Sequence, residues 1–127
     1  MPDDQSKPYV VKPQDAGSTA QTPGMLRIPG VTAASTGASR IWLGTVTAAP
    51  HMRSLPHHHG EAETAVYILR GHLRVYFGEG FTETVEAGPG EFLYVPPLIP
   101  HIEENPYDEE YEAVLARSPD NIVVNLE

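Results

Sequence analysis

Three adjacent histidines and a nearby glutamate have the types and spacing needed to bind a metal ion. His57, His58 and His59 follow a proline directly, and Glu63 comes four residues after the last of them. Because alternate side chains of an extended chain share a face, His57 and His59 point the same way and His58 points opposite. Two imidazoles on one face, with a carboxylate close by, are well placed to chelate one ion.

A further histidine far along the chain completes the donor set. His101 follows Pro96-Pro97-Leu98-Ile99-Pro100, and a barrel can bring this segment beside the histidine run. Three imidazoles and one carboxylate suit Fe(II), Mn(II), Ni(II), Co(II) or Zn(II) rather than calcium. Such a set leaves one or two positions of an octahedral ion open for water or substrate. We therefore expect a divalent transition metal as cofactor.

Short runs of strand-forming residues, separated by turn residues, must position these side chains. Apolar residues alternate with outward-facing ones from Val66 to Phe77, which is period 2 rather than the helical period 3.6. No stretch of ten or more residues keeps a helical apolar face without a breaker. The expected strands lie at 25–28, 41–48, 64–69, 73–77, 81–85, 91–95, 111–116 and 122–126. This pattern predicts an all-β barrel or sandwich.

The first 24 residues differ in composition from the rest of the chain. They contain four prolines with Ser, Thr, Gln and Gly between them, and only Tyr9-Val10-Val11 favours a strand. We expect an N-terminal arm at 1–24 and a barrel domain at 25–127. An arm of this kind can add a strand to a neighbour's sheet, so we predict a homodimer.

Composition and charge narrow the class of protein. The 127 residues include no cysteine, which excludes disulfides, thiolate zinc sites and cysteine nucleophiles. The formal net charge of −9 argues against nucleic-acid or anionic-membrane partners, because a negative surface repels phosphates. No apolar run suits a membrane span or a secretory signal. These features predict a cytoplasmic protein with a small-molecule ligand.

Two segments of the chain resemble the two sequence motifs of the cupin superfamily. The first motif matches within Pro56–Gly71, at His57, His59, Glu63 and Gly71, and the second within 90–105, at Gly90, Pro96, His101 and Asn105. The resemblance implies a jelly-roll barrel, also called a double-stranded β-helix, with the metal inside one mouth. It implies little about the reaction, because one fold hosts many functions.

The fourth ligand has two candidates. Seven residues separate Glu63 from Gly71, whereas the first motif has six, and a one-residue bulge would reconcile the spacing. Pirin-like cupins take a ligand from the glutamate two residues after the second-motif histidine, which is Glu103 in this chain. We prefer Glu63, with Glu103 as the alternative.

The expected cavity is largely apolar, with Val66 and Ile68 inward and Tyr67 outward. The sequence shows no arginine pair for a phosphate, because the arginines that stand out are scattered and suit the surface: Arg40, Arg53, Arg70 and Arg74. This favours an uncharged or aromatic ligand. We therefore expect a metal-dependent enzyme of the dioxygenase, isomerase, cyclase or decarboxylase type. The alternative is a non-catalytic binding or sensor protein whose metal is structural or anchors a ligand.

Overall fold

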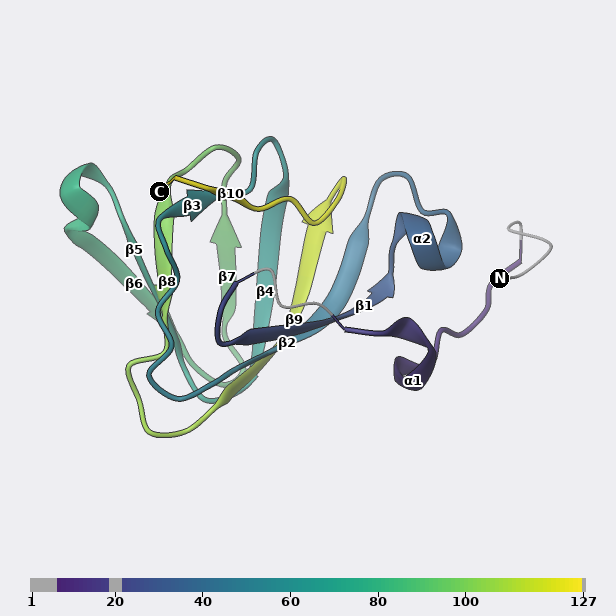
Figure 1. Ribbon diagram of the computed structural model, residues 1–127, viewed down its shortest axis with the longest axis horizontal. Coiled ribbons are helices and arrows are strands. Elements are labelled where there is room, and N and C mark those ends of the chain that lie inside the picture. Colours follow the sequence, from purple (N-terminus) through teal and green to yellow (C-terminus); the bar gives the residue numbers. More distant parts are fainter. Residues whose placement is uncertain (1–6, 19–21, 127) are drawn as a thin grey trace.

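The computed structural model of the chain describes residues 7–18 and 22–126 and folds them into two antiparallel sheets that face each other (Figure 1). The first sheet has the order β1-β2-β9-β4-β7, with β1 at Met25–Val31, β2 at Trp42–Ala48, β9 at Tyr111–Ser118, β4 at Glu63–Arg70 and β7 at Phe92–Val95. The second has the order β10-β3-β8-β5-β6, with β10 at Val124–Asn125, β3 at His57–His58, β8 at His101–Glu104, β5 at Leu73–Phe77 and β6 at Glu83–Ala87. The predicted all-β jelly-roll fold is confirmed.

Alternation along the central strands decides which side chains enter the barrel. Along β4, Val66 and Ile68 are buried while Tyr67 is exposed, as the period-2 pattern predicts. β9 alternates in the same way from Tyr111 to Arg117. The inward faces of the two sheets thus pack on each other, as in other β-sandwiches.

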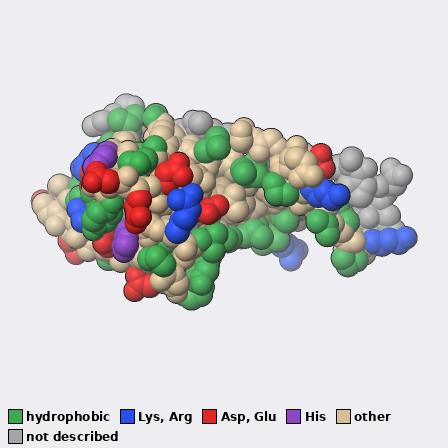
Figure 2. Space-filling model, turned by 90° about the horizontal axis from the view of Figure 1, so that it is seen from below, with side chains coloured by type: hydrophobic (Ala, Val, Ile, Leu, Met, Phe, Trp, Pro, Cys, Tyr) green, Lys and Arg blue, Asp and Glu red, His purple; other side chains and the backbone are tan. Residues whose placement is uncertain are grey.

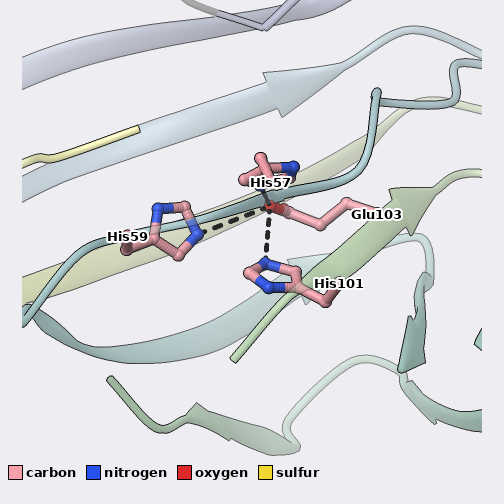
Figure 3. A group of neighbouring side chains, drawn as sticks. All are labelled: His57, His59, His101 and Glu103. Carbon is pink, nitrogen blue, oxygen red and sulfur yellow. Dashed lines mark hydrogen bonds and ion pairs between the residues drawn. The ribbon is translucent and has the colours of Figure 1, made fainter. Parts of the chain in front are cut away.

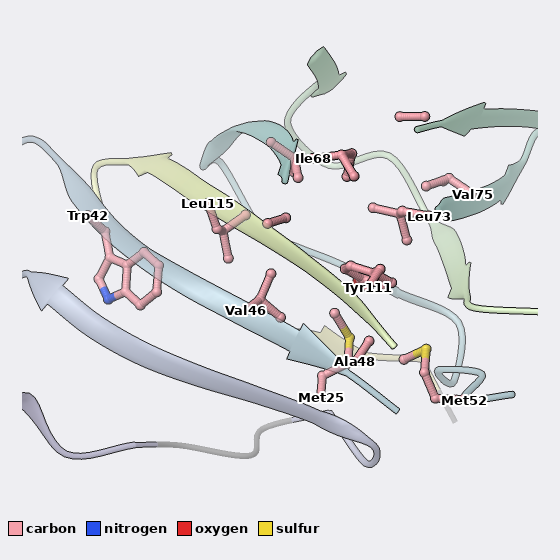
Figure 4. Packing of buried hydrophobic residues seen from close by; sticks show 13 residues of the cluster. Met25, Trp42, Val46, Ala48, Met52, Ile68, Leu73, Val75, Tyr111 and Leu115 are labelled. Carbon is pink, nitrogen blue, oxygen red and sulfur yellow. The ribbon is translucent and has the colours of Figure 1, made fainter. Parts of the chain in front are cut away.

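The hydrophobic core lies between the two sheets, toward the end of the barrel where β2 finishes and β5 begins (Figure 4). Ile68 and Tyr111 are fully buried there, and Trp42 lies at the far side of the cluster. Burying an isoleucine-sized side chain stabilises the fold by about 1.5–3 kcal/mol. Several of these core residues, among them Tyr111, adjoin the buried polar side chains described below.

A glycine turn joins β4 to β5 and fixes their position against β9. Gly71 has a φ of 73°, and a Cβ built on it would lie 2.5 Å from the Glu110 carbonyl oxygen and 2.6 Å from the Tyr111 Cα. Only glycine fits such a left-handed, crowded position. Just before it, the pairing of β4 with β9 shifts register between Ile68 and Arg70, but this irregularity does not turn Glu63 to the interior.

The elements that the sequence does not predict are short. Within the described residues, three single-turn helices lie between or before strands: α1 at Pro13–Ala16, α2 at Ala33–Thr36 and the 3-10 helix η1 at Glu79–Phe81. The α2 turn starts at Thr32, whose side chain accepts the Ser35 backbone N–H in a capping box. β3 and β8 are also missed, because they are brief and rich in His and Glu rather than β-branched residues.

The described part of the N-terminal arm lies along the chain's own barrel. α1 lies beside β1 (Figure 1), and the Tyr9 hydroxyl donates a hydrogen bond to the Ser35 carbonyl oxygen at 3.2 Å. Residues 9–11 form no strand. Residues 1–6 and 19–21 of the predicted arm lie outside the described residues. The division at residue 24 and the homodimer stay predictions.

Surface charges occur in mixed pairs. Arg70 bonds Glu110 and Glu112 across strands, and Arg74 bonds Glu86. Figure 2 shows acidic and basic side chains gathered together over the barrel end of one face. The arginines that the sequence places at the surface are exposed or half-buried in the structure. No helix among the described residues has the length and apolar character to cross a membrane.

Candidate metal site

Four buried side chains converge inside the barrel. His57 lies on β3, His59 follows it directly, and His101 and Glu103 lie on β8. One ligand atom from each lies within 4.8 Å of all the others (Figure 3). These residues, His57, His59, His101 and Glu103, are called the histidine–glutamate cluster below.

Strand pairing explains why these four side chains meet. β3 pairs with β8 so that His57 stands opposite His101. Residues two apart on an extended chain share a face, so His59 and Glu103 turn to the same interior side. β10 pairs with β3 on its other edge, with Val124 opposite His58, and holds the histidine segment against the barrel.

The backbone fixes the orientation of all three rings. Each Nδ1 lies 2.7–2.8 Å from a main-chain carbonyl oxygen, for His57 that of Leu55, for His59 that of Ile122 and for His101 that of Ile99. An acceptor at Nδ1 holds the proton there and sets the tautomer. The Nε2 atom of each ring is therefore the one that faces the cluster.

The three Nε2 atoms differ in their partners. His57 Nε2 lies 2.9 Å from Glu103 Oε2, a hydrogen bond that needs one proton between the two atoms. His59 Nε2 accepts a hydrogen bond from Arg117 Nη2 at 3.1 Å. His101 Nε2 is buried without a hydrogen-bond partner among the described residues, 3.5 Å from the Glu103 carboxylate. A buried ring nitrogen without a partner is costly unless something binds it.

The electrostatics at His59 and Glu103 favour the protonation states that metal ligands need. Burial lowers the pKa of His59 to about 3, and the positive charge of Arg117 adds to this. Burial alone would raise the pKa of Glu103, but the facing imidazoles of His101 and His57 outweigh it and hold this pKa well below its usual range. A neutral imidazole and an ionised carboxylate are the forms that bind metals.

The structure separates the two candidates for the carboxylate. Glu63 lies at the start of β4 with its side chain exposed, and it accepts a hydrogen bond from the Tyr94 hydroxyl at 2.5 Å. It is not part of the cluster, and Glu103 is. His58 also lies outside, where its Nδ1 accepts the Gly60 backbone N–H. The structure thus brings the three predicted histidines together with Glu103, the residue that the sequence analysis ranked second.

Sequence reasoning missed two arginines inside the barrel. Arg27 on β1 and Arg117 on β9 are both buried, and neither is among the scattered surface arginines that the sequence analysis considers. Strand alternation carried the signal, since Arg27 shares a face with Met25, and Arg117 shares one with Leu115. These two residues are called the arginine pair below.

An apolar cleft leads from the surface to the cluster. It has a volume of about 500 Å³ and lies between β5 and β6 on one side and β7 on the other. Val75, Phe77, Leu93 and Val95 are among its lining residues, and His101 is another. A small organic molecule in this cleft would therefore reach the edge of the cluster.

The donor set fits a divalent transition metal. Three imidazole nitrogens and one carboxylate form a ligand set for Fe, Mn, Ni, Co or Zn, and the unpartnered His101 Nε2 is a lone pair that an ion would use. Nδ1 hydrogen bonds to carbonyl oxygens are the usual outer support of metal-binding histidines.

Comparisons with known proteins agree with this fold. A search of the curated proteins finds no match. Among solved structures, the polyketide cyclase RemF from Streptomyces resistomycificus superposes with a TM-score of 0.76 and 21% identity, over 95% of this chain and 87% of that one. KdgF from Halomonas sp. gives 0.69 and 17%, over 89% and 94%. An oxalate oxidase gives 0.72 and 22%, over 98% and 65%.

A family model adds the sequence-level result. The model described as the cupin domain matches residues 44–116, more than half of the chain. The matched segment runs from β2 to β9 and contains the whole histidine–glutamate cluster. The chain therefore belongs to the cupin family.

Proposed function

We propose that the chain is a metal-dependent enzyme acting on a small organic molecule, with a divalent transition metal held by the histidine–glutamate cluster. The observation that carries the proposal is the convergence of three imidazole Nε2 atoms on one carboxylate in a buried site. One of these nitrogens, on His101, has no hydrogen-bond partner among the described residues. Complete ligand sets with fixed outer support are costly to hold without use.

The chain's own residues prepare the site for an ion. Three carbonyl oxygens hold the rings, so the nitrogens need no reorganisation. The proton between His57 and Glu103 occupies the position where two ligands would face the metal, so binding releases it. The bound ion supplies a Lewis acid for a substrate oxygen, or a site for dioxygen.

The apolar cleft would bind the body of the substrate. Its walls are mostly aliphatic and aromatic side chains of β5, β6 and β7, which exclude water from a reacting group beside His101. The named functions of two structural neighbours, a polyketide cyclase and an oxalate oxidase, support an enzyme rather than a purely structural protein. Turnover assays would identify which of the four reaction types, dioxygenase, isomerase, cyclase or decarboxylase, the enzyme catalyses.

Metal content of matched variants tests the ligand assignment. We expect tag-free wild type to bind one ion per chain by mass spectrometry of metals, and Glu103→Gln to bind less than one because it loses the charged ligand. Glu63→Gln is the control, because that side chain is exposed and bonded to Tyr94. Loss of metal in Glu63→Gln with full metal in Glu103→Gln would overturn the assignment.

Turnover assays test the enzymatic part of the proposal. Oxygen uptake and product formation are measured with a panel of phenolic and diketone compounds, with His101→Ala as the metal-site variant. We expect turnover by wild type and none by His101→Ala. A metal-loaded wild type that binds these compounds and converts none of them would instead identify a non-catalytic binding protein.

A further inference from the structure

A second set of polar side chains faces the histidine–glutamate cluster from the opposite sheet. The arginine pair and Tyr111 line a small cavity that also touches His59, His101 and Glu103. Its volume is about 10 Å³, which is room for about one water molecule. The β1 and β9 strands supply this second set, whereas β3, β8 and the residue after β3 supply the cluster.

Arg27 is the unexplained residue in this set. Its side chain is fully buried, and its Nε, Nη1 and Nη2 atoms have no hydrogen-bond partner among the described residues. The Tyr111 hydroxyl, in the middle of the core cluster of Figure 4, is also unpartnered. Arginine keeps its proton in proteins and presents five donors in a planar fork. A buried guanidinium without an acceptor is strongly unfavourable unless an anion binds it.

The charge balance of the interior points the same way. Among the described residues, the buried charged side chains are Arg27, Arg117 and Glu103, and the proton held between His57 and Glu103 adds one positive charge, so the metal-free interior has a net charge of +2. A divalent ion that displaces this proton would raise the net charge to +3. The chain as a whole carries −9, so the positive interior is a local feature of the site. An anion is the ligand that would balance it.

Metal binding would free a further donor for the same anion. Arg117 Nε donates to Thr64 Oγ1 at 2.9 Å, and its Nη2 donates to His59 Nε2. The ion and Arg117 need the same lone pair of His59. Once the ion takes it, Nη2 loses its acceptor and becomes available to a ligand, beside the Tyr111 hydroxyl, whose pKa burial raises well above its usual range.

We propose that Arg27, with Arg117 and Tyr111, forms an anion subsite that binds the carboxylate of a small organic acid whose apolar body lies in the cleft at His101. The proposal rests on the proposed function, because it identifies the substrate class of the same site. A planar carboxylate matches the guanidinium fork with two parallel hydrogen bonds. A tetrahedral phosphate is bulkier than the small cavity favours. Met25 forms part of the cavity wall, and a carboxylate, which is larger than one water molecule, requires this flexible side chain to shift.

Calorimetric binding of benzoate tests the subsite, with benzamide as its uncharged counterpart and inorganic phosphate as the second anion. The proteins are wild type, Arg27→Met, Arg27→Lys and, as matched control, Arg70→Met, which removes an exposed arginine. We expect wild type and Arg70→Met to bind benzoate at least about tenfold more tightly than benzamide. Arg27→Met should lose at least about tenfold in benzoate affinity, and Arg27→Lys should retain part of it.

Measuring each protein both with chelator and with metal separates this proposal from the proposed function. Benzoate should bind the metal-free wild type and bind the metal-loaded one more tightly. If benzoate binding depends on Arg27 but the protein converts none of the tested compounds, the subsite is supported and the proposed enzymatic function is refuted. Equal benzoate affinity in wild type and Arg27→Met overturns the subsite. The subsite is also overturned if wild type binds no benzoate in either metal state, or if it binds phosphate more tightly than benzoate. If Arg27→Met does not fold, undiminished affinity in Arg27→Lys refutes the two-bond geometry.

Discussion

His59 should make the metal-free protein lose stability in mild acid, and replacing it should remove that loss. Burial and Arg117 keep the folded-state pKa of His59 near 3, compared with an ordinary value of 6.5. Between these two pH values, His59 is protonated in the unfolded chain and neutral in the folded chain. Stability therefore rises with pH across this window and falls as the pH is lowered from 6.5 toward 3.

The size of the effect follows from the two pKa values. One proton of difference changes the free energy of unfolding by about 1.4 kcal/mol per pH unit. From pH 7 to pH 4 the His59 contribution amounts to a loss of about 3 kcal/mol. That is a large fraction of the stability of a domain of this size, which is about 5–15 kcal/mol.

The assay is urea unfolding of metal-free wild type and His59→Gln between pH 4 and 8, followed by fluorescence. The single tryptophan, Trp42, is buried and reports unfolding directly. Glutamine does not titrate, so the variant's stability should depend on pH less steeply by about one proton per chain below pH 6.5. Above pH 7.5 the two slopes should coincide, whatever the difference in absolute stability. Parallel curves at all pH values would show that His59 takes up its proton in the folded state, and would refute the reasoning.

Three further substitutions have defined expected outcomes. Ile68→Ala removes a fully buried core side chain and should lower the free energy of unfolding in urea by about 2–5 kcal/mol; a loss below about 1 kcal/mol would mean that the two sheets close over the gap. Gly71→Ala places a Cβ 2.5 Å from the Glu110 carbonyl oxygen at a φ of 73°, so it should lower the free energy of unfolding in urea by more than the roughly 1 kcal/mol of a simple glycine effect; a smaller loss would mean that the β4–β5 turn and β9 move apart to accept the methyl group. Arg117→Met removes a positive charge and the competitor for the His59 lone pair, so chelator competition should show about tenfold tighter metal binding; weaker binding would mean that Arg117 mainly positions His59.

The alternation of apolar residues is enough to predict the all-β fold and most of its strands, because it depends only on which residues are apolar. It located β5 at its observed bounds and the inward faces of Val66 and Ile68. It failed at β3 and β8, which consist largely of histidine and glutamate and pair for only a few residues. Those brief strands are held in place by hydrogen bonds to neighbouring strands that are distant in the sequence. The apolar pattern of a single sequence does not reveal such long-range pairing.

The site was predictable as far as its histidines and less so beyond them. Spacing along one strand brought His57 and His59 together, but the choice between Glu63 and Glu103 depended on which carboxylate faced inward. Glu103 shares the inward face with His101, two residues earlier, and this rule would have ranked it first. Arg27 occupies an inward strand position, where a charged residue departs from the usual apolar interior, so the strand pattern alone does not identify it.

The two faces of the barrel interior come from different sheets, and this separation has a consequence for how such a protein diversifies. The histidine–glutamate cluster lies on or directly beside β3 and β8, whereas the arginine pair and Tyr111 lie on β1 and β9. Under the proposed subsite, substitutions on β1 and β9 would alter which compound is recognised without replacing a metal ligand, although Arg117 also contacts His59. A mutant library confined to the inward positions of β1 and β9 is the natural starting point for directed evolution of a new substrate preference.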